Sequence, residues 1–281
     1  MNIALILDKP ETRSHPVIAQ ALQQLSVAHT IRLLDVQGQT GEQAVERESR
    51  QTLSDLYLLK SHAPQALALA FALEQWGAYV LNSWAASRAC QDRTEMARRM
   101  LEARLPWPQA WNASTLGQAV NDQALAAALP FPLIVKSAYS HQNDLVAKAD
   151  NREALQQLLP RWGEEPVILQ EFLPGDGWDQ KFWVIGTRVF AARRRTPLEA
   201  SAPKEDVPLA PEAIPAEWKQ MVLDVGRVFG LRLYGVDLLQ TERGPLVIDV
   251  NAFPGFRGVP EAAEVLAAFV ERLGLERLAK Q

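Results

Sequence analysis

The chain has 281 residues, 48% of them hydrophobic and 22% charged, which is ordinary for a globular protein with room for two or three subdomains. The net charge of −4 gives no basic field that would favour nucleic acid or an anionic membrane as a partner. The single cysteine, Cys90, excludes an intramolecular disulfide, and the four histidines show no zinc spacing. With no signal-peptide pattern at the start and no 18-residue apolar run, we expect a cytoplasmic protein without a membrane partner.

The first third of the chain alternates between strand-like and helix-like segments. The predicted strands are 2–7, 31–34, 55–60 and 79–81, with helices at 16–25 and 64–76. This alternation favours a small parallel α/β domain over residues 1–90. Lys60 follows the third strand, where open α/β sheets usually contact ligands, although a solvated strand-end lysine also fits the sequence.

The middle of the chain contains an apolar strand that ends in a charge. Asp92 is predicted to cap a helix that runs to Ala103, with Glu95 in the capping-box position. Residues 131–137, FPLIVKS, read as a strand in which Lys136 must direct its ammonium at an anion or at water. A further helix is expected at 151–159 and a strand at 166–173.

Near the C-terminus, a predicted hairpin carries an acid in each strand. Asp237 lies in the first strand and Asp249 in the second, and Asn251 follows on the face of Asp249. Burying these groups without a counter-charge is costly, and hard Mg²⁺ takes oxygen ligands of this kind. The alternative is a hairpin whose acids face solvent.

Three successive arginines end the strand predicted at 188–195. Alternation places Arg193 and Arg195 on one face and Arg194 on the other. Such charges repel one another unless they are solvated or face an anion. The Pro- and Ala-rich residues 196–215 are expected to form a loop, with helices at 217–230 and 260–273.

Four motifs in this order resemble the ATP-grasp superfamily, and the RimK-like ligase group in particular. They are FPLIVK (131–136), QEFL (170–173), GDGWDQKFWVIG (175–186) and the pair GVDLLQ with IDVNAFPG (235–240 and 248–255). The resemblance implies an α/β and α+β ATP-grasp fold that covers nearly the whole chain. It would consist of a pre-ATP-grasp parallel α/β domain (1–90), a central lid subdomain (91–172) and a C-terminal subdomain with the metal site (173–281).

The resemblance also implies ligands for ATP and metal. Asp237, Asp249 and Asn251 would hold Mg²⁺, with Mn²⁺ as an alternative and two ions expected, although most ligases of the group have Glu where this chain has Asp249. The residues implied to contact ATP are Arg93, Lys136, His141, Gln170, Glu171, Phe172, Leu173 and Asp179. Arg93 replaces the usual lysine, and the lid AYSHQNDLV (138–146) lacks the usual glycines.

The remaining implied roles concern the reaction. Lys181 and either Arg193 or Arg195 would stabilise the transferred phosphoryl group, without a choice between the two arginines. Arg257, in the loop after Asn251, and Lys60 would contact the second substrate. Simple surface exposure is the alternative for Arg257.

The implied activity is ATP-dependent, ADP-forming ligation of a small-molecule or peptide carboxylate to an amine through an acyl phosphate. Members of the group form dimers or tetramers, so a homo-oligomer is compatible with the sequence. One rival is an ATP-grasp inositol polyphosphate kinase. This chain also resembles such kinases in Asp249, in the Ser140–His141 pair and in the three arginines. A second rival is a non-catalytic nucleotide-binding protein, suggested by the glycine-free lid and Arg93.

Overall fold

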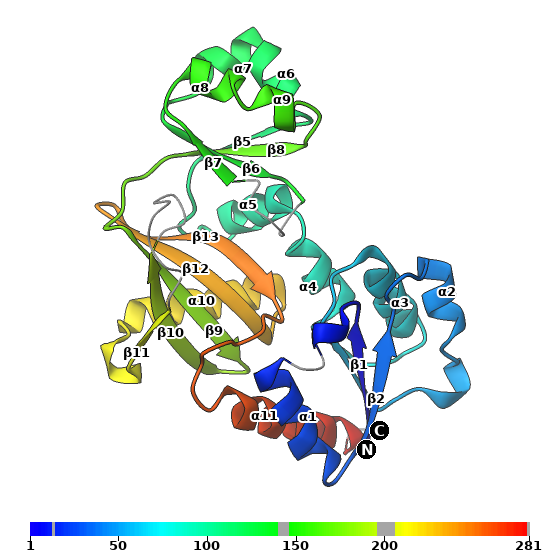
Figure 1. The fold of residues 1–281 in the computed structure, drawn as a ribbon. Coiled ribbons are helices and arrows are strands. Elements are labelled where there is room, and N and C mark those ends of the chain that lie inside the picture. Colours follow the sequence, from blue (N-terminus) through cyan, green and yellow to red (C-terminus); the bar gives the residue numbers. More distant parts are fainter. Residues whose placement is uncertain (13–14, 140–145, 196–205, 280–281) are drawn as a thin grey trace.

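The computed structural model describes the whole chain except residues 13–14, 140–145, 196–205 and 280–281. The described residues form three sheets, which lie within the three predicted sequence ranges. Figure 1 shows the central lobe at the top, the C-terminal sheet at the left and the N-terminal sheet at the lower right.

The N-terminal sheet is parallel, as the alternating sequence pattern predicts, with strand order β2-β1-β3-β4. Its strands are β1 (Asn2–Leu7), β2 (Thr30–Asp35), β3 (Leu56–Leu59) and β4 (Val80–Leu81). The helices of this part are α1 (Pro16–Ser26), α2 (Gly41–Glu46), α3 (Pro64–Gln75) and α4 (Trp84–Ala89), with 3₁₀ turns at Pro10–Thr12 and Arg50–Thr52. Because β1 and β3 are parallel neighbours, Asp8 and Lys60 follow adjacent strands at the same sheet edge.

The central lobe is an antiparallel sheet with strand order β5-β8-β6-β7 and its own hydrophobic core. Its strands are β5 (Ala110–Ala113), β6 (Leu133–Ser137), β7 (Val146–Ala149) and β8 (Val167–Glu171). Four short helices lie on the outer side of this sheet (Figure 1): α6 (Leu116–Asn121), α7 (Gln123–Ala128), α8 (Arg152–Gln156) and α9 (Leu159–Trp162). The sequence pattern did not predict β7, α6 or α7.

The C-terminal sheet is antiparallel with strand order β11-β10-β9-β12-β13. Its strands are β9 (Trp178–Ile185), β10 (Arg188–Arg195), β11 (Val207–Leu209), β12 (Leu233–Thr241) and β13 (Gly244–Ala252). Around it lie α5 (Arg93–Glu102), a 3₁₀ turn at Pro211–Ala213, α10 (Ala216–Phe229) and α11 (Ala262–Leu278). The predicted hairpin is therefore β12–β13, with the turn at Gly244, whose φ of 95° suits glycine.

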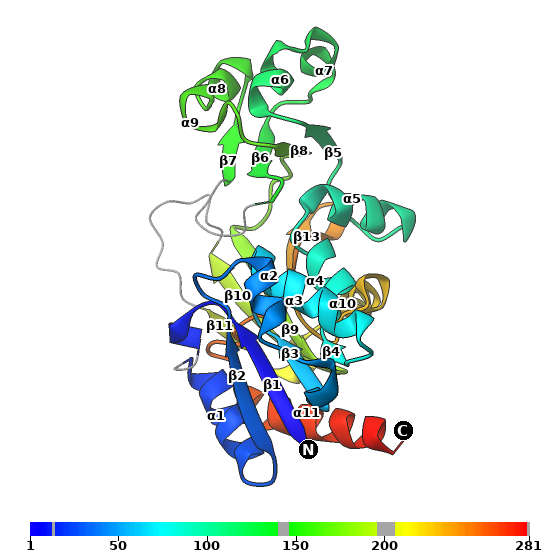
Figure 2. The ribbon, with the colours of Figure 1, turned by 90° about the vertical axis from the view of Figure 1, so that its right-hand side faces the viewer.

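One hydrophobic core joins the N-terminal and C-terminal sheets. Leu5 of β1 and Ile18 of α1 belong to the same buried cluster as Trp183 of β9 and Phe269 of α11. In Figure 2 these two parts form one body at the bottom, and the central lobe stands above it. The division into residues 1–90, 91–172 and 173–281 stays a prediction. The N-terminal and C-terminal sheets share a core, so the core does not separate the first range from the third.

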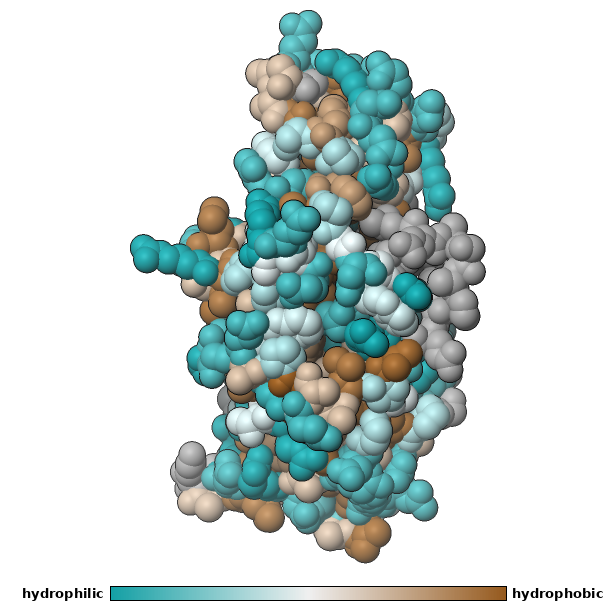
Figure 3. All heavy atoms as spheres, turned by 90° about the vertical axis from the view of Figure 1, so that its left-hand side faces the viewer, coloured by the Kyte–Doolittle hydropathy of each residue, from teal (hydrophilic) through white to brown (hydrophobic). Residues whose placement is uncertain are grey.

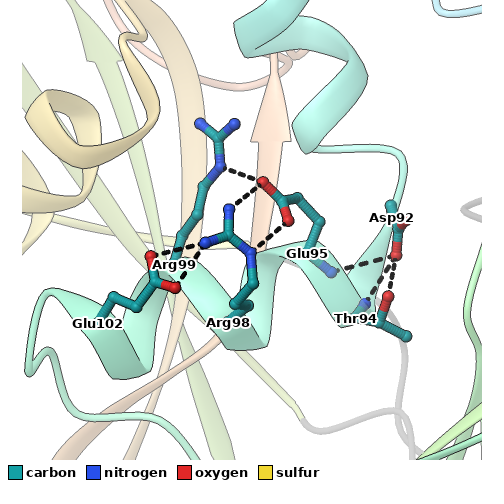
Figure 4. Close-up of polar contacts among 6 residues, drawn as sticks. All are labelled: Asp92, Thr94, Glu95, Arg98, Arg99 and Glu102. Atoms are coloured by element: carbon teal, nitrogen blue, oxygen red, sulfur yellow. Dashed lines mark hydrogen bonds and ion pairs between the residues drawn. The ribbon is translucent and has the colours of Figure 1, made fainter.

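Helix α5 starts as predicted, but its first turn is built differently. The Asp92 side chain accepts hydrogen bonds from the amides of Thr94 and Glu95 (Figure 4). The Glu95 carboxylate pairs with Arg98 and Arg99 instead of completing the predicted capping box. These arginines hold the pKa of Glu95 low, at about 2.

Among the described residues, no helix is long and apolar enough to cross a membrane. Figure 3 shows the face that lies on the left in Figure 1, where hydrophilic residues surround small groups of hydrophobic ones. The described residues form no broad apolar band on this face.

Candidate active site

Two pockets adjoin the inner face of the C-terminal sheet. The first, of about 420 Å³, lies between the central lobe and the C-terminal sheet, and we call it the lobe pocket. The second, of about 650 Å³, lies between the N-terminal and C-terminal sheets, and we call it the sheet pocket. Asp237 lines both pockets, so this carboxylate stands where they meet.

The lobe pocket combines an apolar part with a cluster of charges. Apolar side chains from the central lobe, the hinge and the C-terminal hairpin line it: Ile134, Val146, Phe172, Leu173, Leu239 and Ile248. The charged residues that line it include Arg93, Lys136, Lys148, Asp179 and Asp249. A flat apolar ring and an anionic tail would both find partners here.

The four predicted hinge residues, 170–173, all line the lobe pocket. The amides of Glu171 and Phe172 already donate to the carbonyls of Gln109 (3.0 Å) and Pro132 (3.1 Å). In the part of the chain that the structure describes, no acceptor is bonded to the Leu173 amide. The hinge can therefore offer the Leu173 N–H as a hydrogen-bond donor to a base. Of the predicted hinge residues, we thus expect Leu173 to be the backbone donor.

Lys136 extends from β6 toward the hairpin. Alternation buries Leu133, Val135 and Ser137 behind the sheet and turns Ile134 and Lys136 into the pocket. The Lys136 ammonium donates to the Ile248 carbonyl of β13 at 3.0 Å. Burial lowers the pKa of Lys136 to about 8, and the Asp249 carboxylate nearby opposes that shift.

Strand register places three charged side chains on one face of the sheet. Asp237 of β12 is paired with Lys181 of β9 on one side and with Asp249 of β13 on the other. The Lys181 ammonium contacts both Asp237 oxygens, at 3.0 and 2.9 Å. A β-bulge directly after Asp237 shifts the register of the hairpin at this point.

Asp249 has an unsatisfied oxygen. Its Oδ1 is buried without a hydrogen-bond partner among the described residues and lies 3.8 Å from Arg93 Nε. The Asn251 amide nitrogen lies 3.5 Å from Asp249 Oδ2, which leaves the Asn251 oxygen for another partner. Arg93 is itself buried and donates to the Ser137 carbonyl at 2.7 Å, so it joins α5, β6 and the hairpin.

The donor set fits a divalent cation. Two carboxylates and an amide oxygen are ligands that Mg²⁺ accepts, and Asp249 Oδ1 accepts no hydrogen bond from a described residue. Among the described residues, no group of three or more His, Cys, Asp or Glu side chains is placed to hold a metal. An ion at Asp237, Asp249 and Asn251 would therefore need further oxygens from water or phosphate.

Asp179 lies on the same sheet face, beside these charges. Burial raises the pKa of Asp179 to about 6, and the Asp237 carboxylate adds to the rise. Lys181, Lys136 and Arg194 oppose it. Asp179 thus lines the lobe pocket, which is where its predicted contact with ATP requires it to be. The carboxylate of Asp237, a candidate metal ligand, is close enough to affect its charge.

The three arginines of β10 divide between two faces, as alternation predicts. Arg194 pairs across the sheet with Asp179, which puts it on the face of Asp237 and Lys181. Arg193 and Arg195 lie on the other face and stack on the Trp178 ring, at 5.0 and 4.1 Å from its centroid.

Arg194, which was not among the predicted residues, is thus the arginine that shares the face of the charged cluster. Its guanidinium is held by Asp206 through two 2.6 Å contacts. Which of the two faces carries Asp179, Lys181 and Asp237 depends on the cross-strand register, which the sequence does not display. Lys148 is a second omission, because it comes from the unpredicted strand β7, lines the lobe pocket and lies 4.3 Å from the Phe172 ring centroid.

The predicted substrate residues differ in their placement. Lys60 lines the sheet pocket with Asp8, Lys9 and Phe253. Arg257 is exposed and lines neither pocket, although its charge, like that of Lys60, helps burial to lower the pKa of His15. His141 lies outside the described residues.

Comparisons with known proteins bear on the family and the fold of this chain. The RimK-like ATP-grasp domain matches residues 107–269, which is more than half of the chain. A probable alpha-L-glutamate ligase of Thioalkalivibrio sulfidiphilus is 30% identical over 167 residues, 54% of each chain. A probable alpha-L-glutamate ligase of Legionella pneumophila is 25% identical over 203 residues, 69% of this chain and 65% of the relative. The match thus spans little more than half of the first relative's length.

Solved structures show the same fold. A RimK domain ATP-grasp protein from Sphaerobacter thermophilus superimposes with a TM-score of 0.72 and 20% identity, over 96% of this chain and 99% of that one. D-alanine–D-alanine ligase from Bacillus anthracis gives a TM-score of 0.76 and 16% identity over the full length of both. The ATP-grasp ligase PsnB, complexed with its precursor peptide PsnA2 and AMPPNP, gives 0.66 and 18% over 96% of each chain. These likenesses confirm the predicted fold class.

Proposed function

Because this chain belongs to the RimK-like ATP-grasp family, we propose that it is an ATP-dependent ligase that joins a carboxylate to an amine and releases ADP. The observation that carries the proposal is the position of Asp237, which lines both pockets beside Lys181. A nucleotide in the lobe pocket and a carboxylate in the sheet pocket would meet at this residue.

The lobe pocket would take ATP. Its apolar residues and the Leu173 amide suit the adenine ring, and Lys136 and Arg93 suit the phosphates. Asp237, Asp249 and Asn251 would hold a divalent cation, for which we propose Mg²⁺. When bound, such an ion neutralises phosphate charge and orients the transferred group.

The reaction would proceed by two displacements. A carboxylate oxygen attacks the γ-phosphorus, the bond from that phosphorus to the ADP oxygen breaks, and an acyl phosphate forms. The amine nitrogen then attacks the acyl carbon, the carbon–oxygen bond to phosphate breaks, and the amine loses a proton. Lys181, and Arg194 on the same sheet face, would stabilise the moving phosphoryl group.

The relatives suggest which substrates to test first. Several are named probable alpha-L-glutamate ligases, so L-glutamate is the first candidate for an amino-acid substrate. PsnB is recorded with a precursor peptide, so a peptide carboxylate is a second candidate. The relatives named above do not favour the inositol polyphosphate kinase or the non-catalytic alternative.

Calorimetry with the non-hydrolysable analogue AMPPNP tests the nucleotide site. We expect binding that requires Mg²⁺ and is weakened at least tenfold by Asp249→Ala. The matched control is Asp122→Asn, which keeps a capping side chain at α7, far from both pockets. Equal binding by Asp249→Ala, or none by the wild type, would contradict the proposal.

A coupled assay for ADP release then separates ligase from kinase. We expect turnover that needs an amino acid or peptide, and product mass spectrometry that shows an amide bond. Turnover that needs an inositol phosphate would establish the kinase instead. Replacing Mg²⁺ with Mn²⁺ in the same assay shows which ion supports the reaction.

A further inference from the structure

A third pocket opens at the edge of the C-terminal sheet, and the proposed reaction gives it no role. It measures about 210 Å³, and we call it the edge pocket. Its walls come from β9 and β10, from β11 with the 3₁₀ turn that follows it, and from residues 258–261 before α11. Strand β11 is the last strand on this side of the sheet, so the pocket lies at the margin of the fold (Figure 1).

The walls of the edge pocket are mainly apolar and have a fixed shape. Phe190 and Ile214 are among the side chains that line it, and three prolines line it as well: Pro208, Pro211 and Pro260. Because the proline ring fixes φ, these walls need little ordering when a ligand enters. An apolar cavity of about 150 Å³ already binds benzene, so the edge pocket has room for a phenyl or branched alkyl group.

Two opposite charges stand at the mouth of the edge pocket. Arg188, at the start of β10, and Glu261, before α11, both line it, and their side chains are 60% and 73% exposed. Their nearest charged atoms lie 3.6 Å apart, which is longer than a hydrogen bond. The Arg188 guanidinium lies 5.6 Å from the centroid of the Phe190 ring, over the apolar wall. The two groups therefore hold each other weakly, and each can bind a ligand group of opposite charge.

The backbone of Glu261 is unusual for a residue with a side chain. Its φ of 57° and ψ of 8° lie in the left-handed region, which few residues other than glycine adopt. Glu261 is the N-cap of α11, yet its side chain makes no capping hydrogen bond. The helix therefore does not use the Glu261 carboxylate, and unfavourable backbone conformations of this kind concentrate at binding sites.

We propose that the edge pocket binds a free amino acid with an apolar side chain. The side chain enters the pocket, the α-carboxylate pairs with Arg188 and the α-ammonium pairs with Glu261. Both charged groups of an amino acid are attached to one carbon, so they can reach two side chains whose charged atoms lie 3.6 Å apart. A ligand with only one of the two charges would be repelled by one of these side chains.

This site is separate from the reacting centre. Trp183 lines both the edge pocket and the sheet pocket, so the two are neighbours. However, Lys181 pairs across the sheet with Ala192, and Arg188 lies four residues from Ala192 along β10, or roughly 14 Å at about 3.4 Å per residue. A reacting amine has to come within about 3–3.5 Å of the acyl carbon. An amino acid held by Arg188 and Glu261 therefore does not react beside Lys181, and its binding does not depend on the proposed ligase function.

A series of small ligands tests the site on the wild type by calorimetry, without nucleotide. L-Leucine and L-phenylalanine are compared with glycine, which lacks the side chain, and with N-acetyl-L-leucine and L-leucinamide, which each lack one charge. We expect at least one of the two apolar amino acids to bind five times more tightly than each of the other three compounds. Equal binding of glycine, or of either singly charged compound, would overturn the proposal, and so would the absence of binding by both apolar amino acids.

Substitution then assigns the binding to the edge pocket. Arg188→Gln and Glu261→Gln should each weaken the preferred amino acid at least fivefold, and both positions are exposed, so the fold should persist. The matched control is Arg272→Gln on α11, which removes an arginine that is 64% exposed and does not line the pocket. Unchanged binding in both Arg188→Gln and Glu261→Gln would refute the site.

The coupled assay for ADP release shows whether the site is separate from the reaction. The preferred amino acid should bind with the same affinity, within twofold, whether or not Mg²⁺ and AMPPNP are present. If product mass spectrometry showed this amino acid in the product, with a KM that rises in Arg188→Gln, the edge pocket would hold a substrate and the proposed separation would be wrong. Amino-acid binding without any ligase turnover would count against the proposed function alone.

Discussion

Lys60 and Lys136 each hold an ammonium group inside the protein, at opposite ends of the site. Burial lowers the pKa of both side chains to about 8. Among the described residues, Lys136 has the carboxylates of Asp249, Asp237 and Asp179 near it, whereas Lys60 has that of Asp8. Groups that are unfavourable in the free protein but suited to an anionic ligand are typical of binding sites.

Lys60→Met should therefore stabilise the free protein at pH 7. The pKa of Lys60 is about 8 in the folded chain against an ordinary value of 10.5, so the folded state disfavours the charged form. Below pH 8 both states are protonated and the wild type carries the full cost, which the variant removes. We expect a gain of about 1–3 kcal/mol in the free energy of unfolding, measured by urea denaturation.

The pH dependence of that gain has a definite sign. Between pH 8 and 10.5 the unfolded wild type binds more protons than the folded wild type, so its stability rises with pH. The difference between variant and wild type should therefore shrink across this window. A gain that stays constant up to pH 10.5 would show that packing, not charge, is responsible.

Arg194 is the arginine of β10 that we expect to matter for turnover. It shares a sheet face with Asp179 and Asp237, whereas Arg195 stacks on Trp178 on the other face. Arg194→Gln should lower kcat for ADP release at least tenfold, and Arg195→Gln less than threefold. The reverse order would support Arg193 or Arg195, the arginines predicted from the sequence. Asp206→Asn, which removes the partner of Arg194, separates loss of charge from loss of position.

At the scale of elements, the site depends on how strands are paired. The apolar strand before Lys136 sufficed to predict that its ammonium meets an anion or water, and alternation placed Asn251 on the face of Asp249. That Asp237 joins them was implied by the family resemblance. The contact of Lys181 with Asp237 depends on the register between β9 and β12, which are 55 residues or so apart in sequence and whose pairing no local pattern displays. The same limit explains why Arg194 was not chosen and why Lys60 could not be distinguished from a solvated lysine.

The hinge is tied to the hairpin by one charged contact. The Glu171 carboxylate accepts from the Gln109 amide at 2.9 Å and from Arg243, in the β12–β13 turn, at 2.6 Å. This contact joins the central lobe to the C-terminal sheet at one rim of the lobe pocket. It therefore helps to set the width of that pocket.

Arg243→Gln should loosen this rim. Because Arg243 is largely exposed, we expect its loss to change the free energy of unfolding by less than about 1 kcal/mol. AMPPNP affinity should fall about threefold, since part of the binding energy then orders the rim. The matched control is Arg188→Gln, which breaks the exposed Arg188–Glu261 pair away from the lobe pocket. Equal affinities for the two variants would exclude a role for the contact.

At the scale of the whole molecule, the cores suggest two cooperative units rather than three. The N-terminal and C-terminal sheets share a hydrophobic cluster, and α5 contributes Met96 and Met100 to a second cluster with the C-terminal sheet. The central lobe has a separate cluster around Leu133 and Leu169. The predicted boundary near residue 90 would thus mark a change of sheet without marking an independent folding unit.

Native-state hydrogen exchange can distinguish the two divisions. Leu5 and Leu133 are both fully buried, and Leu→Ala at such positions costs about 2–5 kcal/mol. Leu5→Ala should lower protection in β1 and β9 together and leave the lobe from β5 to β8 unchanged, because Leu5 shares a core with Trp183. Leu133→Ala should do the opposite. If Leu5→Ala weakened only the parallel sheet, three separate units would be the better description.

Because ATP in the lobe pocket would touch both units, AMPPNP should then raise the protection of both at once, which couples ligand binding to closure of the lobe.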